Sequence, residues 1–232
     1  MNIRQFRYGD SNLAYLVFSG SQAAAIDGGA ADEILGFVED NSLELKYVLN
    51  THEHWDHIPG NGRLLKESEA EFISPSKLCE MEYLSLAAEE LKIFPTPGHT
   101  DDSIVFGFDD CLITGDTLFN GTVGNCYTKD YENYFSSLCR ILEFPPETRI
   151  FAGHDLVDYA LAVAAEIDPE NASIADYAAG YSADFVVSTL AMELAVNPFI
   201  RFGDSSLDNF RNGLEMPLGT PYRRWRAMMS VH

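Results

Sequence analysis

The chain has 232 residues, of which 46% are hydrophobic, and a formal net charge of −21. This length allows one large domain or a domain with an appendage, and the hydrophobic content allows a substantial core without disulfides. The acidic charge disfavours nucleic acids and anionic lipid surfaces as partners. No segment reaches the roughly 18 apolar residues of a membrane span, and the first ten residues lack the apolar core of a signal peptide.

The four cysteines lie far apart, without CxxC spacing. This distribution is typical of reduced, mostly buried thiols and not of a disulfide framework. We therefore expect a cytoplasmic protein with no nucleic-acid or membrane partner. The oligomeric state is left open by the sequence.

Apolar runs and alternating patterns predict short strands separated by helices over the first two thirds of the chain. Strands are expected at residues 13–18, 22–26, 45–50, 71–74, 91–94, 103–108, 110–114 and 148–152. Helices are expected at 31–40, from 61 onward with Asn61 as the cap, at 131–142 and at 156–166. Beyond these, strand patterns disappear. The sequence thus predicts a mixed α/β domain over residues 1–155 and a smaller helical domain over residues 156–232.

Four stretches share one layout, in which an apolar strand is followed by a short turn and then by a histidine or an aspartate. They are LKYVLNTHEHWDH, LKIFPTPGHT, CLITGDT and TRIFAGHD. Five of the six histidines fall in these turns, and only His232 does not. Open α/β sheets gather ligands at the carboxyl ends of their strands, so we expect these side chains to meet. Gly98, Gly115 and Gly153 would let the backbone approach closely just before the polar residue.

Gathering so many uncharged imidazoles costs desolvation free energy, which a shared metal ion offsets. His52 and His54 are two positions apart and can face one ion, whereas Asp56 and His57 would turn toward a neighbouring site. Seven candidate ligands exceed the needs of one tetrahedral ion and suit two ions about 3.5–4 Å apart, bridged by one carboxylate and one hydroxide. Nitrogen and carboxylate ligands without thiolate suit zinc, iron or manganese. The candidate ligands are His52, His54, Asp56, His57, His99, Asp116 and His154.

The motifs THEHWDH, PGHT, TGDTLF and AGHD resemble those of the metallo-β-lactamase superfamily, and within it the glyoxalase II (hydroxyacylglutathione hydrolase) branch. The resemblance continues through PPETRIFAGHD and STLAMELAVNPFIR and so covers nearly the whole chain. It implies an αββα sandwich with the metals at one edge, and a helical carboxyl-terminal domain that helps to bind the thiol part of the substrate. It also implies a first site of His52, His54 and His99, a second site of Asp56, His57 and His154, and Asp116 as the bridge.

The resemblance further implies a hydrolase that acts on a small-molecule thioester with two divalent metal ions, zinc being the first expectation. Asp56 and Asp116 would be its catalytic residues, because Asp116 bridges the metals and Asp56 both binds a metal and orients the attacking hydroxide. β-Lactamases of this fold generally lack the bridging aspartate, so Asp116 counts against antibiotic hydrolysis. Two rival functions stay open: a persulfide dioxygenase with one iron held by His52, His99 and Asp116, and a metal-binding scaffold without turnover.

The expected substrate pocket departs from the glyoxalase II pattern. Tyr127 is retained, but Asn125 stands where glutathione-using members typically have a basic residue, and Leu156 replaces a tyrosine after the last histidine. The acyl group and the thiol carrier are therefore left open. An anionic thiol conjugate would need another positively charged region to bind to. The concentrated positive region of the sequence is the arginine-rich tail, which begins at Arg201. Alternatively, the arginines of this tail pair with acidic residues elsewhere on the surface. The expected substrate-binding residues are Tyr127, Arg223, Arg224 and Arg226.

Overall fold

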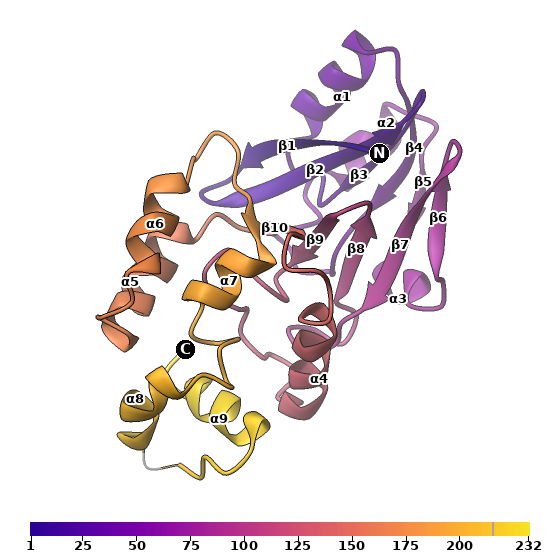
Figure 1. Cartoon of the computed structure of the whole chain (residues 1–232). Coiled ribbons are helices and arrows are strands. Elements are labelled where there is room, and N and C mark those ends of the chain that lie inside the picture. The colour runs from indigo at the N-terminus through magenta and orange to yellow at the C-terminus, as the bar shows by residue number, and fades with distance from the viewer. Residues whose placement is uncertain (215) are drawn as a thin grey trace.

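The computed structural model describes residues 1–214 and 216–232 and shows two β-sheets packed face to face, with helices on their outer sides (Figure 1). The first sheet has the strand order β1-β2-β3-β4-β5. These strands are β1 (Asn2–Tyr8), β2 (Asn12–Ser19), β3 (Gln22–Ile26), β4 (Glu44–Leu49) and β5 (Glu71–Ile73). The second sheet has the order β11-β10-β9-β8-β7-β6. Its strands are β6 (Tyr83–Leu86), β7 (Glu89–Pro95), β8 (Ile104–Phe108), β9 (Cys111–Gly115), β10 (Arg149–Ala152) and β11 (Ser188–Thr189).

Helices fill the connections and most of the carboxyl-terminal part. In the first part they are α1 (Ala31–Asp40), α2 (Asn61–Lys66), α3 (Pro75–Leu78) and α4 (Tyr131–Ile141). The later ones are α5 (Val157–Ile167), α6 (Ser173–Gly180), α7 (Leu190–Val196), a short 3₁₀ helix (Ser205–Leu207), α8 (Asp208–Asn212) and α9 (Pro221–Met228). Within the described residues, no helix combines the length and apolar character needed to cross a membrane.

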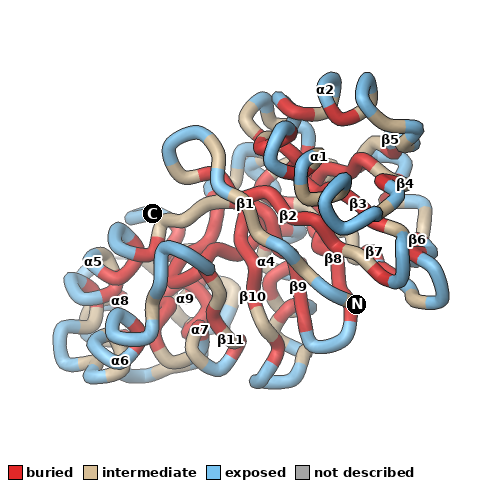
Figure 2. The backbone as a smooth tube through the Cα atoms, turned by 90° about the horizontal axis from the view of Figure 1, so that it is seen from above, coloured by how far each residue is buried: buried red, intermediate tan, exposed pale blue. Residues whose placement is uncertain are grey.

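The main core lies between the two sheets, and β2 shows how the sequence creates it. Alternate side chains of a strand point to opposite faces. Tyr15 and Val17 therefore join the core shared with the second sheet, whereas Ala14 and Leu16 pack on the other face with Ile34 of α1. Figure 2 shows the buried positions running along the strands of both sheets, with exposed positions in the loops and on the outer sides of the helices.

The second sheet is covered on its outer face by α4. Val105 and Leu112 of this sheet pack against Tyr134 and Leu138 of the helix, and Trp225 of α9 belongs to the same cluster. With α1 and α2 on one outer face and α4 on the other, the layers follow the order αββα. The fold class predicted from the sequence is therefore confirmed.

Strand direction explains why the polar turns gather at one edge. β3 runs parallel to β4, and β9 runs parallel to β10. β7 and β9 both pair antiparallel with β8, so they also point the same way. The turns that follow β4, β7, β9 and β10 are those that carry the histidines and Asp116. The expected common edge is thus present in the fold.

Some elements differ from the sequence expectation. Strands β1, β6 and β11 were not predicted, and the prediction that Asn61 caps α2 was wrong. The cap position is Gly60, and the side chain of Asn61 donates a hydrogen bond to Asn50 instead. The separate domain over residues 156–232 stays a prediction. One strand of that range, β11, pairs with β10 and so belongs to the second sheet.

Candidate metal centre

The structure brings together all seven side chains that the sequence singled out as metal ligands. They form two groups, each with potential ligand atoms within 4.8 Å of one another. The first group contains His52, His54, His99 and Asp116, and the second contains Asp56, His57 and His154.

In the first group the ring nitrogens of three histidines converge. The Nδ1 atom of His54 lies 2.9 Å from Nε2 of His52 and 3.0 Å from Nε2 of His99. His52 and His99 are buried, whereas His54 is half-buried. These rings come from two different sheets, because His52 and His54 follow β4 while His99 follows β7.

Asp116 lies between the two groups. Its Oδ2 atom is 3.5 Å from Nε2 of His99 and 3.5 Å from Nε2 of His154, and its Oδ1 atom is 3.4 Å from Nε2 of His57. Asp56 completes the second group, with Oδ2 3.3 Å from Nε2 of His154. One carboxylate thus reaches histidines of both groups, as a bridging ligand must.

The protein alone leaves polar atoms of this cluster unsatisfied. Nε2 of His57 and Oδ1 of Asp116 are buried and have no hydrogen-bond partner among the residues that the structure describes. Buried polar atoms without a partner are rare because their desolvation costs free energy. Imidazole nitrogens and carboxylate oxygens are also the ligand types that zinc and iron accept. The residues present therefore fit a pair of metal ions.

The electrostatics of the cluster agree with this fit. Burial lowers the pKa of both His52 and His99, that of His52 to about 3, so these rings are neutral at pH 7. Burial also opposes the charge of His57, but the carboxylates of Asp27 and Asp116 outweigh it and hold its pKa well above the usual value. Burial would raise the pKa of Asp116, yet contacts with His154 and His57 hold it well below the usual range.

Four of the five histidines are oriented by a contact to the ring nitrogen that points away from the centre. Nδ1 of His52 contacts the hydroxyl of Thr51 at 3.1 Å, and Nδ1 of His154 contacts the hydroxyl of Ser11 at 3.1 Å. The backbone carbonyl of Asn125 lies 2.9 Å from Nδ1 of His99. Such contacts fix the tautomer and direction of a metal-binding ring, leaving Nε2 for the ion.

Asp27 is the fourth orienting partner, and it was not among the predicted site residues. Its Oδ2 atom lies 3.0 Å from Nδ1 of His57 and accepts the hydroxyl of Thr51 at 2.7 Å. It is fully buried and follows β3 directly, in the stretch AAAIDGGA. This stretch has the same strand-to-turn layout as the four histidine stretches, which is the signal that could have found it.

Glycines beside the centre allow the close approach that the sequence predicted. A Cβ atom on Gly153 would lie 2.3 Å from Oδ1 of Asp116, and one on Gly115 would lie 2.5 Å from the hydroxyl of Thr51. Gly115 also has a φ of +50°, a backbone conformation that favours glycine. A larger residue at Gly153 would occupy space next to the bridging carboxylate.

A cavity of about 520 Å³ opens onto the two groups. Five members of the groups face it: His54, Asp56, His99, Asp116 and His154. The rest of its lining consists of Trp55, Phe119, Asn125, Tyr127 and Leu156. The predicted substrate-binding residue Tyr127 therefore lies at this cavity.

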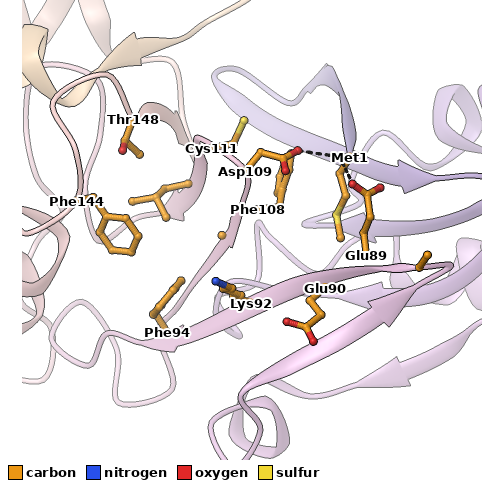
Figure 3. A pocket seen from close by; sticks show the side chains of 13 residues that line it. Met1, Glu89, Glu90, Lys92, Phe94, Phe108, Asp109, Cys111, Phe144 and Thr148 are labelled. Atoms are coloured by element: carbon orange, nitrogen blue, oxygen red, sulfur yellow. Dashed lines mark hydrogen bonds and ion pairs between the residues drawn. The ribbon is translucent and has the colours of Figure 1, made fainter.

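A second cavity of similar size, about 530 Å³, lies over β7, β8 and β9 (Figure 3). Its side chains include Lys92, Phe94 and Asp109, and it shares no residue with the two histidine groups. Because members of the two ligand groups line the first of these two cavities and not the second, we take the first as the candidate active site.

The three tail arginines do not line the candidate active-site cavity. Arg224 donates hydrogen bonds to the backbone carbonyls of Phe202 and Leu218. The guanidinium of Arg226 lies 3.7 Å from the centre of the Tyr131 ring, and Arg223 is exposed. Their role in substrate binding stays a prediction.

Comparison with known proteins gives a family match for most of the chain. The sequence model described as Metallo-beta-lactamase superfamily matches residues 7–82 and 86–154. A hydroxyacylglutathione hydrolase of Idiomarina loihiensis is 32% identical, and the matched region covers 78% of each chain. A second hydroxyacylglutathione hydrolase, from Pelagibacter ubique, is 31% identical over 88% of this chain and 94% of that one.

Solved structures share the fold at lower identity. ETHE1 from Myxococcus xanthus is similar with a TM-score of 0.68 and 24% identity, covering 98% of this chain and 100% of that one. TTHA1623, described in a di-iron-bound form, has a TM-score of 0.62 and 23% identity, covering 84% of this chain and 99% of that one. At these sequence identities, 24% and 23%, the similarity shows a shared fold and no more.

Proposed function

The chain belongs to the metallo-beta-lactamase superfamily, and on this premise we propose that it is a thioester hydrolase that works with two divalent metal ions. The observation that carries the proposal is the pair of ligand groups joined by Asp116. The relatives named hydroxyacylglutathione hydrolase support a thioester as the bond that is cleaved.

In this proposal the two ions are held by the two groups of the centre. His52, His54 and His99 would hold one ion, Asp56, His57 and His154 the other, and Asp116 would reach both. Ions bound there would supply Lewis acidity and lower the pKa of water toward about 7. Zinc is the metal we propose, while the nitrogen and oxygen ligands also suit iron or manganese.

Asp56 is the carboxylate best placed to handle the attacking water. Its side chain is 22% exposed and faces the cavity, whereas that of Asp116 is 8% exposed. The amide of Asn12 donates a hydrogen bond to Oδ2 of Asp56 at 3.1 Å, and the hydroxyl of Tyr8 donates to its backbone carbonyl at 2.8 Å. The carboxylate held in this way would accept a hydrogen bond from the attacking water and orient it toward the acyl carbon.

The reaction adds one water to the thioester. The water oxygen bonds to the acyl carbon, the carbon–sulfur bond breaks, and the proton taken from water goes to sulfur, leaving a carboxylic acid and a thiol. Tyr127 and Phe119 lie beside the histidines of the first and second group, respectively, and would exclude bulk water from the breaking bond.

Metal analysis and a thioester assay test the proposal together. Protein purified without chelators should contain close to two metal ions per chain and should hydrolyse lactoylglutathione or another thioester. The variant Asp116→Ala should lose both properties, because the shared ligand is gone, while the exposed control Asp40→Ala should keep both. A metal content near zero in the wild type would refute the proposal.

The rival functions give different results in the same experiments. A persulfide dioxygenase would consume oxygen with glutathione persulfide in an iron-dependent manner, and such a signal would replace the hydrolase proposal. The complete second group, Asp56, His57 and His154, favours hydrolysis by two ions over a single iron. A scaffold would bind metal and hydrolyse no thioester, lactone or phosphoester.

A further inference from the structure

The lining of the active-site cavity suggests which thioesters fit it. We propose that the cavity takes thioesters whose thiol portion is uncharged and apolar, and that it disfavours thiols carrying a carboxylate. This inference rests on the proposed thioester hydrolysis and adds to it the substrate class. It departs from the expectation that an anionic conjugate binds through the arginine-rich tail.

Aromatic side chains lie directly against the histidines of both groups. The ring centre of Tyr127 is 5.4 Å from that of His54 and 5.2 Å from that of His99. The ring centre of Phe119 is 5.8 Å from that of His154. A substrate whose acyl carbon reaches the metal centre must therefore place its neighbouring atoms beside Tyr127 and Phe119, which both line the cavity.

The mouth of the cavity adds further apolar surface. Trp55 is 83% exposed and Tyr127 is 63% exposed, although both are large aromatic side chains. Leu156 lines the cavity as well. Aromatic side chains contribute large favourable free energies when a ligand removes them from water. Contact with Trp55, Tyr127 and Leu156 would therefore favour the binding of an apolar thiol.

Apart from the ions that the ligand groups would hold, positive charge is missing from the described part of the lining. Over the described residues, no lysine or arginine lines this cavity. Lys129, two positions after Tyr127, is exposed and not part of the lining. Asn125 offers only a neutral amide, whose Oδ1 atom lies 3.3 Å from Nδ1 of His232.

The tail cations are used for other contacts. Arg224 bonds to two backbone carbonyls, and Arg226 lies over the Tyr131 ring. Arg201 pairs with Asp168 and Asp204. In a chain of net charge −21, a carboxylate on the thiol, lying away from the metal centre that receives the acyl group, would meet general repulsion and no lysine or arginine among the described lining residues.

A matched pair of substrates tests the inference. The acetyl thioesters of benzyl mercaptan and of 4-(mercaptomethyl)benzoate share the same ring and differ by one carboxylate. We expect kcat/KM to be about tenfold higher for the neutral ester at low salt, which is the effect of roughly one unfavourable charge contact. Added salt should narrow the difference, because it screens the repulsion.

A designed cation should reverse this preference. The variant Asn125→Arg places a guanidinium at the cavity and keeps the backbone carbonyl that contacts His99, so it should raise kcat/KM for the carboxylate ester and lower the selectivity for the neutral one. Asn41→Arg adds the same charge on an exposed helix end outside the cavity and should change neither. Replacing Arg223, Arg224 and Arg226 by alanine tests the alternative, in which the arginine-rich tail binds the carboxylate of the substrate.

Fluorescence provides a readout that does not depend on turnover. The chain has two tryptophans, Trp55 at the cavity mouth and the fully buried Trp225. Titration with S-benzyl thioethers, which cannot be hydrolysed, should shift the Trp55 emission to the blue at lower concentration for the neutral compound than for its carboxylate. The variant Trp55→Phe should lose the response.

The outcomes separate the two proposals. If neither of these esters nor lactoylglutathione is cleaved, the hydrolase proposal fails, and the fluorescence titration still decides the inference about the cavity. If the carboxylate ester is preferred, or if the arginine triple variant weakens its binding, the inference is overturned while thioester hydrolysis stands. Preference for the neutral ligand in both assays supports the inference.

Discussion

The orientation of His57 depends on a single buried carboxylate, that of Asp27, and the variant Asp27→Asn isolates its contribution. Oδ2 of Asp27 lies 3.0 Å from Nδ1 of His57 and 2.7 Å from the hydroxyl of Thr51, while Oδ1 accepts the Thr51 N–H at 2.8 Å. Asparagine keeps the shape but replaces one acceptor oxygen by an NH₂ group. Either the groups that contact Oδ2, on His57 and Thr51, or the backbone N–H of Thr51 that donates to Oδ1 must therefore face an N–H donor instead of an acceptor oxygen.

The expected magnitudes follow from this loss. A donor left without a partner in a fully buried place costs about 1–3 kcal/mol of unfolding free energy. Loss of the group that orients a metal-binding ring lowers metal affinity by about 10–100-fold. The backbone adds no strain to this effect, because Asp27 has a φ of +51°, which asparagine also adopts readily.

Metal affinity, measured by competition with a chromophoric chelator, is the deciding quantity, and urea unfolding gives the stability. Asp110→Asn is the matched control, since it removes an exposed carboxylate paired with Arg149 at 2.8 Å, far from any ligand group in the fold. Exposed pairs contribute about 0–1 kcal/mol, so the control should keep its metal affinity and nearly all its stability. If Asp27→Asn binds metal as tightly as the wild type, Asp27 does not orient His57.

Two further predictions concern packing and pH. Gly153→Ala should cost about 1–3 kcal/mol of stability and reduce metal content, because the added Cβ would lie 2.3 Å from Oδ1 of Asp116, whereas Gly36→Ala in α1, with open space around it, should stabilise by about 0.5–1 kcal/mol in the same urea experiment. The backbone N–H of Ser206 and the guanidinium of Arg201 lower the pKa of Asp204 from its ordinary value of 3.8 to about 2. The ionised carboxylate therefore stabilises the folded state at pH values above 3.8, and this contribution is lost as the pH falls toward 2. The stability difference between the wild type and Asp204→Asn should accordingly be present at pH 5 and shrink below pH 3.8, and a difference independent of pH would contradict this assignment.

Sequence patterns predicted the central strands because these strands are buried on both faces. β8, IVFGF, is buried at every position, and β2 is buried at nearly every position, which gives continuous apolar runs. The three strands that the sequence missed are all edge strands of their sheets. β1 mixes apolar residues with Arg4, Gln5 and Arg7 and is only partly buried, and β11 has only two residues. Short or half-exposed strands leave weak apolar patterns.

The candidate ligands could be predicted because several histidines that each follow an apolar strand form a pattern that is rare by chance. Their orienting partners were not readable. Ser11 and Thr51 are ordinary turn residues in the sequence, and Asn125 contributes a backbone carbonyl, which any residue type could supply. The contacts of Arg224 were equally hidden, because they depend on where the carbonyls of Phe202 and Leu218 lie in space.

The division of the ligands between two sheets also bears on how the chain folds. Strands β1 to β5 come from residues 2–73 and strands β6 to β10 from residues 83–152, so each sheet forms almost entirely from one continuous stretch of chain. Pairings between residues close in sequence form more readily, because closing a long loop costs more entropy. His52 and His57 belong to the first stretch, and Asp116 and His154 to the second. The centre is thus complete only where the two sheets pack together, and ions bound there would stabilise this packing more than either sheet by itself.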